Sequence, residues 1–383
     1  MKPYATYRHR HTVLPRRILL LGSLLLAALT VSHAQTTAPD TARFAAQLDS
    51  LRTHYHVLGL SYVVLRGDNI LQQGGLGFAD LQTLAPATSA TNYRIASLTK
   101  PIAATLLLQL QEAGQLDIQD PIKPLIPGYE DYYRQVKAYV LANEPQYVRL
   151  VEHFDFERDD LTIWHHLTHT AEYVPGDTFS YNGFLYGGLA RLMEVTLQQP
   201  FAEILQQRVL TPLAMRTSAP SQETASDSVL QLLAKPYAYG GVGADSFTLA
   251  EYPSPDVNAG AGIVSNVLDL ANFDRAIRDY RLISAESQQA AWTNQLNNAG
   301  EPIPYGLGWF VQRDPAGRRV VWHYGWQPGS FSGLYLKYPD EDLTFIVLAN
   351  GENLSAPFGE LGYREDVFVS PFAGLFMETF VDY

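Results

Sequence analysis

The chain has 383 residues, with 27 basic and 39 acidic side chains and a net charge of −12 at pH 7. Because such a surface repels phosphate backbones and anionic membranes, nucleic acid is disfavoured as a partner. The sequence contains no cysteine, which excludes disulfides, thiolate metal sites and a thiol nucleophile. The length suggests one large domain or two interleaved domains.

The first 34 residues have the pattern of a secretory signal peptide. Four arginines precede an apolar run at residues 18–31, and Ser32-His33-Ala34 supplies the small residues that signal peptidase prefers. The run is too short for a comfortable bilayer span, and no cysteine follows it for lipid attachment. We therefore expect cleavage after residue 34 and an exported protein, periplasmic or secreted, without a stable membrane anchor.

Hydrophobic periodicity predicts strands near both ends of the remaining chain and helices between them. The first two strands form a hairpin around the Gly67-Asp68-Asn69 turn, and Gly114 ends the first helix. The predicted elements are strands 61–66 and 70–78, helices 97–112, 161–170 and 184–198, strands 319–323, 331–338 and 343–349, and helix 366–379. This order indicates one sheet assembled from both ends of the chain. We assign residues 35–112 and 290–383 to a sheet domain and residues 113–289 to an inserted, mainly helical domain.

Residues 129–160 differ from the rest of this helical region. They are rich in tyrosine and acids, with Asp155, Glu157, Asp159 and Asp160 close together. Such a group is typical of a solvated face, and the alternative is a glycosidase-like carboxylate pair.

The first candidate for chemistry is the pair Ser97 and Lys100. Residues three apart on a helical turn share a face, so the lysine amine can reach the serine hydroxyl. A helix start also favours developing negative charge on the serine or its substrate. The lysine must be neutral to accept a proton, which requires a lowered pKa. Taken alone, the four residues from Ser97 to Lys100 are also compatible with an N-cap serine and a solvated lysine.

Two further segments have weaker signals when taken singly. Tyr181 stands where a turn leads into a helix, so its phenol could face a cleft. His323 and Gly325 end a strand, where a backbone N–H can serve an oxyanion and glycine permits close approach. Taken singly, each of these segments is better explained by ordinary packing than by a functional role.

Taken together in order, these segments resemble the family of class C β-lactamases, penicillin-binding proteins and related esterases. The matching stretches are residues 93–100, 116–121, 161–170, 260–262, 305–309 and 347–350. The resemblance spans nearly all of residues 45–350. It implies an α+β fold of the β-lactamase/transpeptidase type, with an antiparallel sheet flanked by helices and a site beside the helical domain.

The resemblance also implies catalytic roles. Ser97 would be the nucleophile, Lys100 its general base, and Tyr181 the group that shuttles protons and activates the deacylating water. His323 would replace the family's third-motif cation. The backbone N–H groups of Ser97 and Trp326 would form the oxyanion hole.

Substrate recognition is where the sequence departs from the family pattern. Gly325 would keep the strand open for substrate, and Asn182 is the candidate for the family's substrate-binding asparagine. In the family this asparagine is the third residue of a Tyr-x-Asn motif. Here Gly183 holds that position after Tyr181, and Asn182 stands one place early. The family's "H-T-S-G" has become His169-Thr170-Ala171-Glu172. We therefore expect residues 129–160 to reshape or cover the cleft in place of a shortened loop.

A metal site is a different interpretation of the same region. His165 and His169 stand four apart on one helical face, with His166 between them. The metalloprotease pattern requires glutamate beside the first histidine, and that position is His166. We therefore expect no metal, and the sequence requires no other cofactor.

The sequence leaves three functions open. An esterase or D-amino-acid peptidase acting on small ester, amide or short peptide substrates is favoured. A true β-lactamase or D-Ala-D-Ala carboxypeptidase is disfavoured by the displaced asparagine and by His323 in place of a lysine. A non-catalytic penicillin-binding-like module is disfavoured by the complete set of Ser97, Lys100 and Tyr181.

Overall fold

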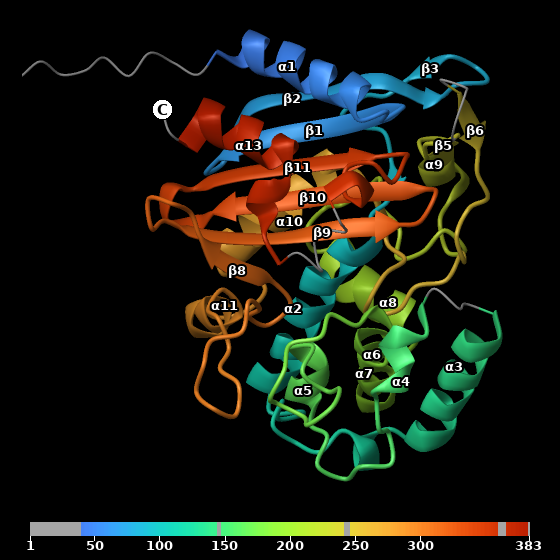
Figure 1. Ribbon diagram of the computed structural model, residues 1–383, viewed down its shortest axis with the longest axis vertical. Helices are drawn as coiled ribbons and strands as arrows, with labels where there is room; N and C mark the ends of the chain where they lie inside the picture. Colours follow the sequence, from blue (N-terminus) through green and yellow to red (C-terminus); the bar gives the residue numbers. More distant parts are fainter. Residues whose placement is uncertain (1–39, 144–146, 241–245, 359–364, 382–383) are drawn as a thin grey trace, which may run out of the picture. The chain divides into compact units, whose positions relative to one another are not determined.

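A seven-stranded antiparallel sheet joins the two ends of the chain (Figure 1). The computed structural model describes residues 40–143, 147–240, 246–358 and 365–381, so the predicted signal peptide lies outside these ranges. In spatial order the strands are β3 (Ala85–Pro86), β2 (Asn69–Asp80), β1 (Gly59–Arg66), β11 (Leu343–Ala349), β10 (Phe331–Tyr338), β9 (Arg319–Gln327) and β8 (Phe310–Arg313). Val63 of β1 pairs with Ile346 of β11. The predicted sheet assembled from both ends is therefore confirmed.

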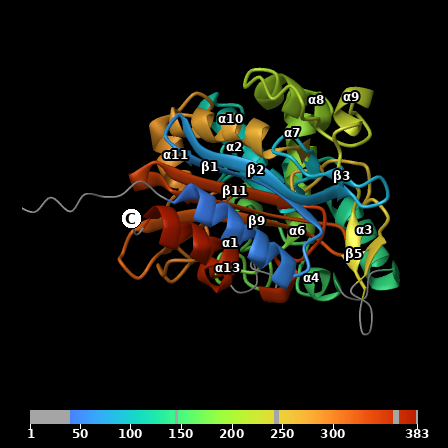
Figure 2. The ribbon, with the colours of Figure 1, turned by 90° about the horizontal axis from the view of Figure 1, so that it is seen from above.

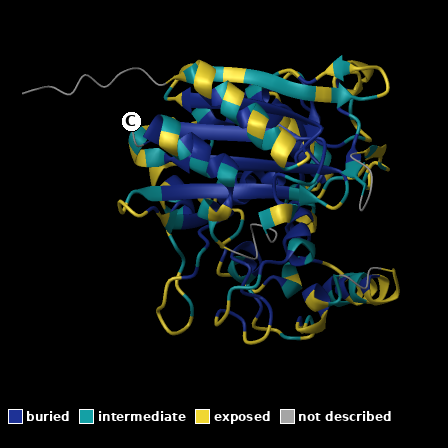
Figure 3. Ribbon diagram, turned by 45° about the horizontal axis from the view of Figure 1, so that its top comes forward, coloured by how far each residue is buried: buried dark blue, intermediate teal, exposed yellow. Residues whose placement is uncertain are grey.

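The central strands are buried on both faces because alternate side chains enter two separate cores. Val63 and Leu65 join the core on one face, and Tyr62 and Val64 join the core on the other. Figure 3 shows these strands as a buried layer, with the exposed positions on the outer surfaces of the helices.

Helices cover both faces of the sheet (Figure 2). On one face lie α1 (Thr41–His54) and α13 (Pro371–Phe376), which contact each other. On the other face lie α2 (Thr99–Glu112) and α10 (Val267–Arg278). The sequence had placed α10 in the inserted helical region, but its buried stripe contacts β1 and β11. This helix therefore belongs with the sheet.

Further helices and two short ribbons complete the fold of the described residues, with α3 to α7 near the end of α2 that points away from the sheet (Figure 1). The helices are α3 (Tyr129–Asn143), α4 (Arg149–Glu152), α5 (Ile163–Leu167), α6 (Gly183–Gly187), α7 (Leu189–Leu197), α8 (Phe201–Leu205), α9 (Asp227–Leu230) and α11 (Ala285–Ala291). Two ribbons pair β4 (Tyr93–Arg94) with β7 (Val264–Ser265), and β5 (Tyr237–Tyr239) with β6 (Phe247–Leu249). From Pro39 onward the chain forms one compact unit. Among its described helices, none combines the length and apolar character of a membrane span.

Two predicted helices are shorter than expected. The helix expected at residues 161–170 is α5, which Thr162 caps by accepting a hydrogen bond from the His165 N–H. It ends before His169, whose φ of +58° is left-handed. The helix expected at residues 366–379 is broken into a 3₁₀ turn, α13 and a final π-type turn. Because proline fits the first turn of a helix, α13 begins at Pro371.

Candidate active site

Ser97 lies in a strained turn between β4 and α2. The turn is a 3₁₀ segment, Ala96–Leu98, and Ala96 has a left-handed φ of +49° although it is not glycine. Such strain persists only where surrounding contacts hold it, and it is common at active sites. Here the turn packs against β9, and Ser97 is partly exposed in a pocket of about 240 Å³.

Lys100 is held beside Ser97 as the spacing predicted. Its Nζ lies 2.8 Å from Ser97 Oγ and 3.0 Å from the carbonyl oxygen of Gly260. The side chain is 1% exposed, and burial lowers the pKa of Lys100 to about 7. A neutral amine at this position can donate to the Gly260 carbonyl while it accepts the proton of Ser97.

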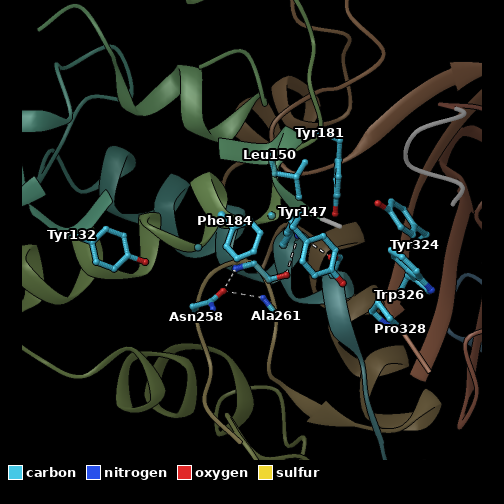
Figure 4. Close-up of a pocket in the computed structure, with 15 residues that line it drawn as sticks. Tyr132, Tyr147, Leu150, Tyr181, Phe184, Asn258, Ala261, Tyr324, Trp326 and Pro328 are labelled. Atoms are coloured by element: carbon cyan, nitrogen blue, oxygen red, sulfur yellow. Dashed lines mark hydrogen bonds between the residues drawn. The ribbon is translucent and has the colours of Figure 1, made fainter. Parts of the chain in front are cut away.

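The Gly260 carbonyl is itself positioned by a residue that the sequence analysis missed. Asn258 Oδ1 accepts hydrogen bonds from the N–H groups of Gly260 at 2.8 Å and Ala261 at 3.2 Å. Both contacts are drawn in Figure 4. The only sequence signal was the family-like stretch at residues 260–262, which carried no assigned role.

Tyr181 also lines the pocket, as the family resemblance implied. Its ring centroid lies 5.0 Å from Lys100 Nζ, and Figure 4 shows its hydroxyl directed into the pocket. The ring packs against Phe310 and Tyr324, with centroid distances of 5.7 and 5.4 Å. The phenol is thus placed near the serine and lysine by packing from the sheet.

A buried carboxyl group holds the segment that carries Tyr181. Glu172, at the altered end of the His169-Thr170-Ala171-Glu172 motif, is 1% exposed. The hydroxyl of Ser180 donates a hydrogen bond to it. Burial raises the pKa of Glu172. This contact ties the short loop to the residue immediately before Tyr181.

Asn182 does not line the pocket, contrary to the prediction that it binds substrate. Its Oδ1 accepts hydrogen bonds from the N–H groups of Phe184 and Leu185, so it is the N-cap of α6. Its Nδ2 donates to the carbonyl of Leu150, and the residue is completely buried. Every polar group of the side chain is therefore engaged in holding the fold.

His323 does not provide a cation to the pocket either. The Nδ1 nitrogen lies 2.8 Å from the Tyr324 carbonyl, so it must carry the proton, and Nε2 then accepts from the Tyr305 hydroxyl at 3.0 Å. The imidazole is completely buried. Burial first, and then the charge of Lys100, hold the pKa of His323 well below its usual range. His323 is thus a neutral residue behind the pocket, where Tyr324 is the strand residue that lines it.

Gly325 serves the nucleophile turn rather than the substrate. A Cβ at this position would lie 2.5 Å from the carbonyl oxygen of Ile95 and 3.3 Å from the Ala96 side chain. Glycine is therefore required for the close approach of β9 to the turn that carries Ser97. Trp326, the next residue, does line the pocket together with Ser97, and their predicted oxyanion role stays a prediction.

Residues 129–160 contribute a wall of the pocket that motif matching did not assign. Tyr132, Tyr147 and Leu150 come from this segment, and Phe184 comes from the start of α6. Figure 4 shows Tyr147 and Phe184 side by side. This agrees with the expectation that the segment reshapes the cleft, although the sequence analysis named none of these lining side chains. Its acids do not line this pocket, and Asp160 pairs with Arg158 on the surface.

The three histidines of the metal alternative have separate partners. His165 Nδ1 accepts from the N–H of Thr162 as part of a capping box. His166 lies between the Tyr129 hydroxyl and the Leu185 carbonyl, and the Nδ1 nitrogen of His169 accepts from the Asn182 N–H. Within the described ranges, no three His, Asp or Glu side chains converge as metal ligands.

Comparisons with known proteins agree with this arrangement. A family model described as Beta-lactamase matches residues 42–367. The chain is 26% identical over 326 residues to Penicillin-binding protein 4* of Bacillus subtilis (strain 168), covering 79% of this chain and 71% of that protein. The structure resembles an octameric penicillin-binding protein homologue from Pyrococcus abyssi, with a TM-score of 0.66, 19% identity and coverage of 85% and 76% of the two chains. It also resembles a β-lactamase/D-alanine carboxypeptidase from Pseudomonas syringae, with a TM-score of 0.64, 18% identity and coverage of 82% and 94%. The two structural likenesses confirm the predicted fold class.

Proposed function

We propose, because this chain belongs to the β-lactamase family, that it hydrolyses small esters or amides through a covalent acyl-enzyme on Ser97. Homologues in this family are serine hydrolases. The observation that carries the proposal is the 2.8 Å separation between Ser97 Oγ and the Nζ of a buried Lys100. A lysine with a pKa of about 7 is available as a base at neutral pH.

In acylation, the neutral amine of Lys100 takes the proton of Ser97 while Oγ bonds to the substrate carbonyl carbon. The backbone N–H groups of Ser97 and Trp326 are the candidates for stabilising the oxyanion. The bond to the leaving group then breaks, and the leaving group takes up the proton held by Lys100.

Deacylation repeats the sequence with water. Water bonds to the acyl carbon and loses its proton to the pair formed by Tyr181 and Lys100. The ester bond to Ser97 breaks, Ser97 regains its proton, and the acid leaves. Tyr181 fits this role because its ring lies against Lys100 in the same pocket.

The favoured substrates are small esters or amides, including short D-amino-acid peptides. The pocket is small, and among the described residues that line it only Lys100 has a charged side chain. His323 offers no cation to a substrate carboxylate because it is buried and its pKa is lowered. β-Lactam hydrolysis or D-Ala-D-Ala carboxypeptidase activity is the second candidate, supported by the likeness to the β-lactamase/D-alanine carboxypeptidase from Pseudomonas syringae and to Penicillin-binding protein 4*.

The experiment is intact mass measurement after incubation with a fluorophosphonate probe, and separately with a penicillin, alongside Ser97→Ala. A single probe adduct that is absent from the variant is the expected result. A penicillin adduct as well would favour the second candidate. If neither reagent labels the protein, the proposal is wrong and a non-catalytic binding module becomes the better account.

We also propose that the protein is exported after removal of residues 1–34. The support is the signal-like sequence pattern described above. Intact mass of protein recovered from the periplasm and medium tests this proposal. A chain that retains these residues in the cytoplasm would contradict it.

A further inference from the structure

Six aromatic residues line the pocket beside Ser97: Tyr132, Tyr147, Tyr181, Phe184, Tyr324 and Trp326. Tyr147 and Phe184 contact each other edge to face, with ring centroids 5.9 Å apart and an interplanar angle of 69°. Tyr324 and Trp326 belong to β9 and line a separate edge of the same pocket (Figure 4). Tyr147, Phe184 and Trp326 line the pocket and are only partly buried.

Charged groups are scarce in this pocket. Among the described residues that line it, Lys100 has the only charged side chain, and its Nζ already contacts Ser97 and Gly260. Arg149 does not line this pocket but a second, polar one, which Glu152 also lines and which shares Leu150 and Tyr181 with the first. A substrate carboxylate beside Ser97 would therefore lose its hydration without gaining a dedicated cation.

The acidic residue Glu352 lies next to Trp326, a β9 residue that lines the pocket. Glu352 Oε2 accepts hydrogen bonds from the indole Nε1 of Trp326 at 3.1 Å and from the N–H of Gly329 at 3.0 Å. The carboxylate fixes the Trp326 ring at the pocket. It also places negative charge where it opposes an anionic substrate.

We infer that this pocket selects an uncharged substrate that carries an aromatic ring, with Tyr147 and Phe184 as specificity-determining residues and Glu352 as a positioning residue that disfavours anions. The inference rests on the proposed hydrolase function. Edge-to-face and offset-stacked contacts favour a flat ring over a saturated ring of similar size.

The test compares kcat/KM for esters that differ in one group. Vinyl acetate has no ring, vinyl 3-phenylpropanoate has an aromatic ring, vinyl 3-cyclohexylpropanoate has a saturated ring, and monovinyl succinate has a carboxylate. Benzyl acetate against ethyl acetate tests a ring on the alcohol side. We expect about a tenfold preference for the aromatic ring on at least one side, and the lowest value for the succinate. Equal turnover of the phenyl and cyclohexyl esters with no benzyl preference, or efficient turnover of the succinate, would overturn the inference.

Substitutions test which side chains cause the preference for an aromatic, uncharged ester. Tyr147→Ala and Phe184→Ala should each reduce the ratio of aromatic to non-aromatic turnover severalfold. Tyr139→Ala is the matched control, because Tyr139 lies in the same segment and is 57% exposed, and it should leave the ratio unchanged. Glu352→Gln keeps an acceptor for Trp326 and should raise the relative turnover of the succinate. An unchanged ratio in both aromatic variants would remove Tyr147 and Phe184 from the inference.

The two proposals fail in distinguishable ways. If no ester is hydrolysed and the fluorophosphonate probe does not label Ser97, the hydrolase function itself is wrong. If vinyl acetate is hydrolysed only when Ser97 is present but the aromatic ring gives no advantage, the specificity inference alone is wrong.

Discussion

Lys100 Nζ lies 2.8 Å from the Oγ of Ser97, and the lysine is almost completely removed from water. Its other hydrogen-bond partner is the carbonyl oxygen of Gly260 rather than a carboxylate. Burial without an acidic partner lowers the pKa of an amine, so the lysine can be neutral near pH 7 and act as a base. This relationship leads to the first two predictions.

Replacing Lys100 by arginine should abolish acylation. Guanidinium keeps the positive charge but cannot accept a proton near neutral pH. We expect the rate of fluorophosphonate labelling to fall at least about 100-fold, the low end of general-base contributions. Lys137→Arg on α3 is the control for the substitution and should label normally. Fast labelling of the Lys100 variant would refute the assignment of this residue as the base.

The acylation rate should rise with pH through the range around 7. Raising the pH deprotonates Lys100, whose pKa is about 7, so the reactive fraction grows roughly tenfold from about pH 6 to the plateau. Burial keeps His323 neutral over this range, so its titration should not add a second inflection to the plot of acylation rate against pH. Single-turnover rates with an uncharged ester provide the measurement. A pH-independent rate, with the fold intact by circular dichroism, would contradict the prediction.

Gly325→Ala should disturb the nucleophile turn without touching the pocket directly. The added Cβ would lie 2.5 Å from the Ile95 carbonyl oxygen, so β9 and the turn must separate. We expect the free energy of unfolding to fall by about 1–3 kcal/mol, with slower labelling of Ser97. Urea denaturation and labelling kinetics measure the two effects.

Gly374→Ala is the matched control for that change. A Cβ at Gly374 would meet no described atom within 4 Å, and the residue lies in α13. Alanine there should leave labelling unchanged and raise the free energy of unfolding by up to about 1 kcal/mol. If Gly325→Ala behaved in the same way, the close approach to Ile95 would not be a constraint.

Asn182→Ala should reduce the stability of the protein, because Asn182 holds the fold rather than the substrate. The change removes the cap of α6 and the hydrogen bond to the Leu150 carbonyl. We expect a loss of about 0.5–2 kcal/mol in the free energy of unfolding from the cap alone. Thermal and urea denaturation give the stability, and ester kinetics give KM. A raised KM with unchanged stability would restore Asn182 as a substrate-binding residue.

Features that depend on local geometry followed from the amino-acid sequence. Ser97 and Lys100 share a helical face because residues three apart always do. Short apolar runs between turn residues located β1 and β9 to β11, because turn residues mark the ends of a strand whatever lies beside it. Asparagine before a helix is a common N-cap signal, but the family resemblance led us to assign Asn182 to substrate binding, and its capping role was recognised in the structure.

Which groups share an environment depends on the tertiary structure. His323 lies on a correctly predicted strand, but Tyr305 and the Tyr324 carbonyl bind both of its ring nitrogens in the interior. Tyr147 and Asn258 meet at one pocket although more than a hundred residues separate them in the chain. Burial, hydrogen-bond partners and therefore pKa depend on contacts between distant segments, which spacing and periodicity do not record.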